Sequence, residues 1–213
     1  HVELLYMYIA DLQDYFQLLY KRFRIRPKHF EIRDAIDRCL EMIRPRADEK
    51  SIKVQLKFHH PLRDDEVILN DPNRFQQVVL NLLCNAVQFN HEEGFIEVEV
   101  SEEGEKKIRV EISDSGIGIA PDDRERVFDA FNAIHGDDQS TEEGVGLGLW
   151  ISRCICRQIG DDLQIDPWFK NGTKFIFLID KDMNPSFEYS DSDQRNRTMI
   201  RTGSVAAPDN TLM

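Results

Sequence analysis

Three short motifs in a fixed order constrain this chain more than any other feature. Residues 81–85 place two asparagines one helical turn apart, residues 114–118 follow an aspartate with two glycines, and residues 144–149 repeat glycine at every second position. Amide oxygens can hold a metal ion, a carboxylate can read the edge of a base, and glycine loops let backbone N–H groups approach phosphate. We interpret the three motifs together as parts of one nucleotide pocket.

The length, composition and charge of the chain limit its class. It has 213 residues, of which 41% are hydrophobic, enough for one α/β domain with a sizeable core. The net charge of −12 argues against a nucleic-acid surface, which needs a basic face, so we expect no nucleic-acid partner. A nucleotide is still compatible with this charge, because Mg²⁺ can mediate the contact.

The cysteines and the N-terminus predict a reducing, cytoplasmic environment. Cys39, Cys84, Cys154 and Cys156 form no C-x-x-C pair and lie in apolar helical patterns, so we expect reduced core residues. No run reaches the roughly 18 apolar residues of a membrane span, and the N-terminus lacks the basic flank of a signal peptide. Since the chain begins at His1, we expect a piece of a longer protein, located in the cytoplasm or on the cytoplasmic side of a membrane.

An apolar heptad pattern runs through residues 1–24. Its spacings alternate between three and four, which predicts a bundle or coiled-coil helix that ends before Arg26-Pro27. The alternative is one amphipathic helix packed on its own domain. The heptad positions are Val2, Leu5, Ile9, Leu12, Phe16, Leu19 and Phe23.

The rest of the chain predicts an α/β two-layer sandwich, in which a mixed sheet is covered on one face by helices. Residues 183–213 are polar and poor in aliphatic side chains, which predicts a disordered tail. The expected helices cover residues 32–43, 71–89, 121–130 and 146–159. The expected strands cover residues 52–58, 67–69, 95–100 and 108–114, with a closing hairpin of 163–168 and 173–179.

The helix expected from Asp71 carries the first motif. Asp71-Pro72 supplies an N-cap acceptor followed by proline at the first helical position. Asn81 and Asn85 lie one turn apart, so their amides stack at the edge of the buried face, where they could complete the shell of Mg²⁺ beside phosphate oxygens. The alternative is a pair of ordinary asparagines at the boundary of the core.

Asp114 is the most informative single residue of the second motif. The period of two along its strand places it on the same side as Ile112 and Val110, which is the core side. A buried carboxylate costs several kcal/mol unless it is hydrogen-bonded, and an adenine amino group would satisfy it. Gly116 and Gly118 would let the backbone approach the base without a Cβ clash. The alternative is a carboxylate that only caps the following turn.

The third motif opens a helix. Gly144, Gly146 and Gly148 precede and enter the helix start, where free N–H groups and the positive end of the dipole attract phosphate. Thr173, which follows Asn171-Gly172, could close the pocket. A plain hairpin turn explains Thr173 nearly as well.

Taken in order, these motifs resemble the boxes of sensor histidine kinase catalytic domains. Residues 71–89 resemble the asparagine box of that family, and residues 114–119 its first glycine box. Residues 127–131 resemble its phenylalanine box, residues 144–149 its second glycine box, and residues 171–173 its last. The resemblance covers about residues 3–180. The wider superfamily includes DNA gyrase, a heat-shock chaperone family and mismatch-repair ATPases.

The resemblance implies a Bergerat-type ATP-binding fold that takes ATP and Mg²⁺. Asn85, assisted by Asn81, would hold the metal, Asn81 would also serve catalysis, and Asp114 would read the adenine amino group. Residues 132–143 would form a lid over the triphosphate. The nucleotide-binding residues implied are Asn81, Asn85, Gln88, Asp114, Gly116, Gly118, Ile119, Phe131, Gly144, Gly146, Leu147, Gly148, Leu149 and Thr173.

The resemblance also implies a kinase role in two-component phosphorelay signalling. The γ-phosphoryl group would pass to a histidine on a dimeric helical hairpin, and then to an aspartate on a response-regulator receiver domain. Residues 1–26 would supply the second helix of that hairpin, with a homodimer formed through residues 1–24. Residues 28–182 would be the ATP-binding catalytic domain, followed by the tail of residues 183–213.

The chain departs from the family pattern at three points. No histidine stands in the acceptor context, so we expect the acceptor histidine to lie outside this fragment. Gln88 stands where the family usually has a lysine near the phosphates. The lid has no Lys or Arg, and its acids would face a triphosphate, which is unfavourable. These acids are Asp137, Asp138, Glu142 and Glu143.

Two alternatives to a kinase therefore stay open. One is a degenerate module that binds nucleotide or dimerises without turnover. The other is a different ATPase of the superfamily, for which a glutamate at the position of Asn81 would be expected as general base.

Overall fold

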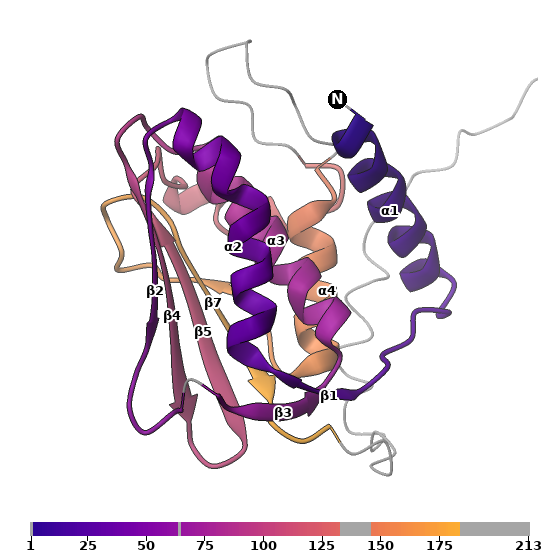
Figure 1. Cartoon of the computed structure of the whole chain (residues 1–213). Helices are drawn as coiled ribbons and strands as arrows, with labels where there is room; N and C mark the ends of the chain where they lie inside the picture. Colours follow the sequence, from indigo (N-terminus) through magenta and orange to yellow (C-terminus); the bar gives the residue numbers. More distant parts are fainter. Residues whose placement is uncertain (1, 64, 133–145, 184–213) are drawn as a thin grey trace, which may run out of the picture. The chain divides into compact units, whose positions relative to one another are not determined.

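A mixed five-stranded sheet forms the centre of the protein. The structure, a computed structural model, describes residues 2–63, 65–132 and 146–183, which belong to one unit (Figure 1). In the sheet order β2–β4–β5–β7–β6, only the β2–β4 pair is parallel. The strands are β2 (Lys53–Phe58), β4 (Phe95–Glu103), β5 (Lys107–Asp114), β6 (Gln164–Ile165) and β7 (Lys174–Asp180).

Helices cover one face of this sheet, so the predicted two-layer sandwich is confirmed (Figure 1). Val98, Val110 and Phe177 alternate with more exposed residues along their strands and are at most 1% exposed on the covered face. A small second sheet pairs β1 with β3. The covering helices are α2 (Ile32–Glu49), α3 (Pro72–Gln88) and α4 (Gly148–Ile159), and the small sheet joins β1 (Lys28–Glu31) to β3 (Val67–Asn70).

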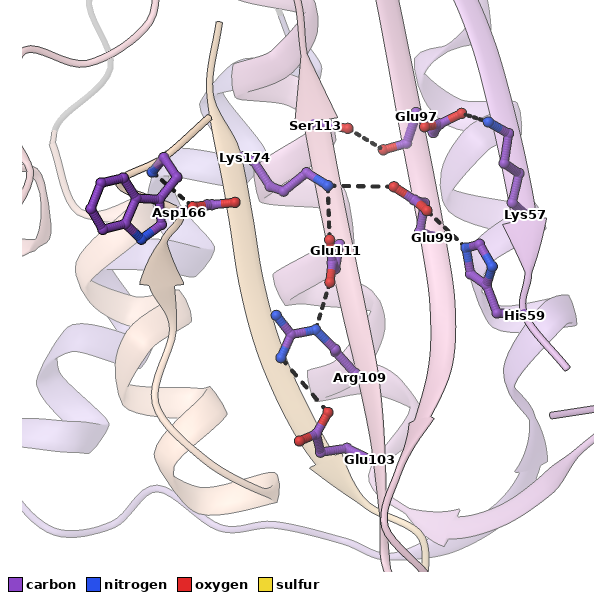
Figure 2. Close-up of polar contacts among 11 residues, drawn as sticks. Lys57, His59, Glu97, Glu99, Glu103, Arg109, Glu111, Ser113, Asp166 and Lys174 are labelled. Carbon is purple, nitrogen blue, oxygen red and sulfur yellow. Dashed lines mark hydrogen bonds and ion pairs between the residues drawn. The ribbon is translucent and has the colours of Figure 1, made fainter. Parts of the chain in front are cut away.

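The other face of the five-stranded sheet carries charged side chains that pair with one another. The Lys174 ammonium lies 2.8 Å from a Glu111 carboxylate oxygen and 3.4 Å from Glu99 (Figure 2). Arg109 bridges Glu111 and Glu103 farther along the same face. The alternation of β4 and β5 therefore places their charged residues on this face and their apolar residues under the helices.

Helix α3 begins as the sequence predicts. The Asp71 carboxylate accepts hydrogen bonds from the backbone N–H groups of Asn73 and Arg74, and Pro72 occupies the first turn. The second carboxylate oxygen accepts from the backbone N–H of Arg26, at 2.7 Å. Asp71 thus caps the helix and also attaches the segment that follows α1 to the domain.

Several elements differ from the prediction for local reasons. The short helix expected from Pro121 is two 3₁₀ turns, η1 (Pro121–Asp123) and η2 (Arg126–Phe128), because the segment lacks the apolar repeat of an α-helix. Helix α4 begins two residues later than expected, since Gly146 has φ +70° and cannot be helical. Met183 donates its N–H to Leu69 and so belongs to the folded unit.

The N-terminal helix α1 (Val2–Leu19) is shorter than the heptad pattern predicts. Lys21 adopts φ +54°, and the Arg22 N–H donates to the carbonyl of Gln17, which closes the helix end. Phe23 therefore leaves the heptad seam. The guanidinium of Arg74 lies over the Phe23 ring, with its central carbon, Cζ, 4.0 Å from the ring centroid.

One side of α1 packs on its own domain. Asp14 is 6% exposed and accepts hydrogen bonds from Arg74 at 2.7 Å and from Gln77 at 2.8 Å. The Tyr15 ring contacts Phe131 and Trp150, with centroids 5.0 and 5.2 Å apart. These contacts match the alternative of an amphipathic helix packed on its own domain.

The heptad side of α1 is nevertheless exposed among the described side chains. Ile9, Leu12, Phe16 and Leu19 are each between 42% and 47% exposed, although all are large and apolar. The helix thus has one side packed on the domain and an apolar side left open. An open apolar seam of this spacing is typical of a helix that packs against another helix.

We expect the packing of α1 to weaken as pH rises. Burial, together with the nearby Asp14 carboxylate, raises the pKa of Asp11 to about 6. A raised carboxyl pKa means that the packed state holds its proton more tightly, so packing is favoured below this pH and weakened as pH rises through it. In a Trp168→Phe background, Trp150 fluorescence should change between about pH 4 and 6, the interval between the ordinary pKa of Asp11, 3.8, and its raised pKa. Asp11→Asn should flatten this transition, and an identical transition in both proteins would contradict the assignment.

Candidate nucleotide-binding site

Asp114 ends strand β5 on the core side, as the period-two pattern predicts, and is 5% exposed. Its Oδ1 accepts hydrogen bonds from the backbone N–H groups of Gly116 at 2.8 Å and Thr173 at 3.3 Å. Burial raises the pKa of this carboxyl, and the two N–H donors act in the opposite direction. Within the described part of the chain, Oδ2 has no hydrogen-bond donor. One oxygen therefore caps the turn while the other remains available to a ligand.

Glycines let the backbone close around Asp114. A Cβ on Gly172, which has φ +128°, would overlap the Asp114 carbonyl oxygen and lie 2.9 Å from Ser115 Cα. A Cβ on Gly116 would overlap the Phe89 carbonyl oxygen, which also accepts the N–H of Ile117. The glycine loops thus bring three chain segments together behind the carboxylate.

Asn90 and Ser115 support the same loop, and neither was among the residues predicted for the site. Asn90 is 7% exposed, donates to the Phe95 carbonyl at 3.0 Å, and accepts from the Ser115 hydroxyl at 3.0 Å. The Phe95 N–H donates in turn to Ser115 Oγ at 2.8 Å. The available signal was the position of Asn90 directly after the C-cap of α3, where asparagine is one of the favoured residues.

The first and third motifs meet where α3 passes the start of α4. Asn81 is half-buried and donates through Nδ2 to the Ser152 hydroxyl at 2.9 Å. A Cβ on Gly148 would overlap the Asn81 side-chain oxygen and lie 3.0 Å from its Cγ. The glycine at the start of α4 therefore makes room for the Asn81 amide, and Ser152 orients it.

Asn85 lies one turn farther along α3 and is half-buried. Its backbone carbonyl accepts the Phe89 N–H, whereas its side-chain amide has no hydrogen-bond partner within the described ranges. The described residues include no cluster of three or more His, Cys, Asp or Glu side chains that could hold a metal. An amide oxygen beside phosphate oxygens is a suitable ligand for Mg²⁺, so Asn85 fits the predicted metal role.

The remaining predicted binding residues divide by exposure. Phe131 is 54% exposed at φ +62°, and its N–H donates to the Gly146 carbonyl at 3.0 Å. Leu147 is 1% exposed, so its side chain belongs to the core and only its backbone could contact a ligand. Gln88 is exposed and Ile119 packs partly on the core. Leu149 is partly buried against the core, and Thr173 is 8% exposed. Gly118 adopts the left-handed backbone conformation, with φ +73°.

Part of the predicted site lies outside the described residues. This applies to Gly144 and to the acidic side chains expected in the lid, which fall within residues 133–145. The described part of the site thus comprises the carboxylate of Asp114, the amides of Asn81 and Asn85, and the glycine turns around them.

Comparison with known proteins decides the family. A family model described as histidine kinase-, DNA gyrase B-, and HSP90-like ATPase matches residues 70–183, more than half of the chain. The chain belongs to this family. The match begins one residue before the Asp71 cap and ends at Met183, so it includes every motif that surrounds the pocket.

Named members of the histidine kinase branch of this family are similar over most of the chain. Signal transduction histidine-protein kinase BarA of Escherichia coli is 29% identical over 182 residues, covering 84% of this chain and 20% of BarA. Hybrid signal transduction histidine kinase B of Dictyostelium discoideum is 30% identical over 175 residues, which cover 80% of this chain and 9% of that kinase. The chain thus spans a fifth or less of the length of these relatives.

Solved structures of histidine kinases share the fold of this family member. Full-length ShkA in complex with AMPPNP superposes with a TM-score of 0.70 at 28% identity, covering 82% of this chain and 35% of ShkA. The catalytic domain of ThkA gives a TM-score of 0.63 at 24% identity, covering 75% of this chain and 99% of that domain. The α/β architecture is therefore that of histidine kinase catalytic domains.

Proposed function

We propose that this chain is the ATP-binding catalytic part of a sensor histidine kinase. It binds ATP and transfers the γ-phosphoryl group to a histidine that lies outside these 213 residues. Asp114 carries the proposal, because Oδ1 is fixed by two backbone N–H groups while Oδ2 is left for the adenine amino group. Membership of the ATPase family and similarity to named histidine kinases support it.

The proposed acceptor lies on a helical hairpin that includes α1. Support comes from the exposed seam of Ile9, Leu12, Phe16 and Leu19, which has the spacing of a bundle helix. We propose that this seam packs against the other hairpin helix and a second copy of the chain. The phosphoryl group then passes from the histidine to the aspartate of a response-regulator receiver domain, as in two-component phosphorelay signalling.

We propose that the Asn85 amide oxygen would help to hold Mg²⁺. The metal would supply positive charge that stabilises the phosphoryl group during its transfer. Asn81 would assist, although its amide is already oriented by Ser152. Gly146, Gly148 and the N-terminus of α4 would supply N–H groups for the phosphates.

The metal role predicts a particular pattern of affinities. Asn85→Ala should weaken ATP binding with Mg²⁺ by about tenfold, because one metal ligand is lost, yet leave binding in EDTA almost unchanged. Isothermal titration with and without the metal measures both values. Gln55→Ala, which removes an exposed side-chain amide from β2 outside the nucleotide site, is the matched control. Equal losses with and without Mg²⁺ would contradict the assignment of Asn85.

The cellular location proposed is the cytoplasm or the cytoplasmic side of a membrane. Cys39, Cys84, Cys154 and Cys156 are all free thiols, and burial raises the pKa of each, so they are poor nucleophiles. Free buried thiols are usual in reducing compartments. None of the described helices has the length and apolar character needed to cross a bilayer.

A further inference from the structure

The segment between α1 and β1 separates its apolar and its basic side chains. Phe23 and Ile25 are half-buried and pack against the core, whereas Arg22, Arg24 and Arg26 alternate with them and are exposed. This alternation places the three guanidinium groups, here called the linker arginines, on the outer side of the segment. They lie close to the start of α3, to which Asp71 attaches the Arg26 backbone.

The linker arginines line a pocket of about 330 Å³. Gln17 contributes from α1, and Asp71, Asn73 and Arg74 contribute from the first turn of α3. The pocket therefore lies at the junction of three segments: the end of α1, the linker and the N-terminus of α3. Its volume is at the lower end of the range for small-molecule sites.

The charges in this pocket do not balance. Both oxygens of Asp71, which is 3% exposed, are already occupied by backbone N–H groups. Arg74 pairs with Asp14 at 2.7 Å. None of the linker arginines forms an ion pair with any described residue. Among the described residues, the linker arginines thus have no ion-pair partner, and the single charge of the Asp71 carboxylate offsets only one of the three cations.

On the outer face of the five-stranded sheet, by contrast, cations are paired with carboxylates. There, Lys174, Arg109 and Lys57 each lie beside a glutamate (Figure 2). Clustered cations repel one another and destabilise a compact arrangement unless an anion compensates them. An anion in the pocket would relieve this repulsion.

We propose that this pocket binds a small anion with two or more phosphate groups. Guanidinium groups present paired N–H donors that match phosphate oxygens in a bidentate arrangement, and several together favour a multiply charged anion. A pyrophosphate-sized ligand suits the volume, whereas a larger polymer does not. Bound there, it links α1 to α3 and stabilises the packed position of α1. The site is independent of the proposed kinase function, because it shares no residue with the nucleotide pocket.

The experiment uses the full 213-residue chain, labelled with ¹⁵N and free of metal, at constant chloride concentration. Pyrophosphate is titrated while backbone amide shifts are recorded, so that binding at the linker is resolved from binding at Gly116 or Gly146. The test variant combines Arg22→Gln, Arg24→Gln and Arg26→Gln. The control combines Arg44→Gln, Lys53→Gln and Lys106→Gln, which removes the same charge from exposed positions elsewhere.

We expect saturable shifts at the linker arginines and Asn73, with affinity about tenfold lower in the test variant and unchanged in the control. Citrate, titrated in parallel, should bind more weakly because its carboxylates are not arranged like a diphosphate. Shifts confined to the glycine loops, shifts that do not saturate, or equal affinity in the test variant would overturn the proposal. Equal affinity for citrate would overturn its phosphate specificity.

Discussion

Asp114→Asn will lower the affinity for ATP by about a hundredfold. The Gly116 and Thr173 N–H groups hold one side-chain oxygen, so an asparagine will direct its carbonyl toward these donors. Its NH₂ group will then face the adenine amino group, and two donors will meet. Losing a hydrogen bond to a charged group while a donor stays unpaired costs roughly 1.5–3 kcal/mol. Isothermal titration with Mg²⁺ and ATP measures the loss.

Inosine triphosphate separates the loss of base recognition from damage to the fold. It carries a carbonyl where adenine has the amino group, so the parent protein should reject it and Asp114→Asn should accept it better than ATP. A reversal of preference cannot arise from unfolding. Equal affinity of parent and variant for ATP would show that Asp114 does not read the base.

Gly172→Ala will destabilise the domain by about 3 kcal/mol or more, because the new Cβ meets backbone that cannot rotate away. It would overlap the Asp114 carbonyl oxygen and lie 2.8 Å from Asp114 C, at a φ of +128° that alanine rarely adopts. For a domain of this size we expect the thermal midpoint to fall by about 10 °C. Differential scanning calorimetry measures this change.

Gly104→Ala is the matched control for this substitution. Gly104 also has positive φ, +64°, but nothing lies within 4 Å of its added Cβ. It should therefore show only the conformational cost of about 1–2 kcal/mol. Equal effects at both positions would mean that backbone strain alone, and not the close approach at Asp114, makes glycine necessary at residue 172.

Regular local patterns predicted the parts of the fold that depend on neighbours in sequence. The cap at Asp71 and the core-side position of Asp114 follow from residue type and from the period of the element. The end of α1 was misplaced, because the heptad pattern continues through Phe23 while the backbone turns at Lys21. There, the contact of Phe23 with Arg74 outweighs the helical pattern.

Contacts between distant segments could not be predicted from the sequence. The Asn81–Ser152 bond joins residues 71 positions apart, and the Ser115–Asn90 bond joins residues 25 positions apart. Gly172 is another example, because a side chain there would collide with the backbone of Asp114 at the end of β5. Such contacts depend on how elements pack, which no local period encodes.

Helix α1 contacts the nucleotide site on one side and carries the seam of the proposed hairpin on the other. Tyr15 contacts Phe131, whose N–H donates to Gly146, while the opposite side of the helix carries the open heptad seam. A change in the nucleotide loop around Gly146 could therefore alter the packing of α1 through direct contacts. The pH dependence expected for Asp11 reports on the same packing.

Phosphoryl transfer in trans is the most direct test of the proposed kinase function. The chain is incubated with radiolabelled ATP, Mg²⁺ and a separate helical hairpin that carries a histidine followed by an acidic residue. We expect acid-labile label on the hairpin, none on the isolated chain, and almost none when Asp114→Asn replaces the parent. Failure to label any hairpin despite normal ATP binding, or strong histidine labelling of the isolated chain, would contradict the proposed function.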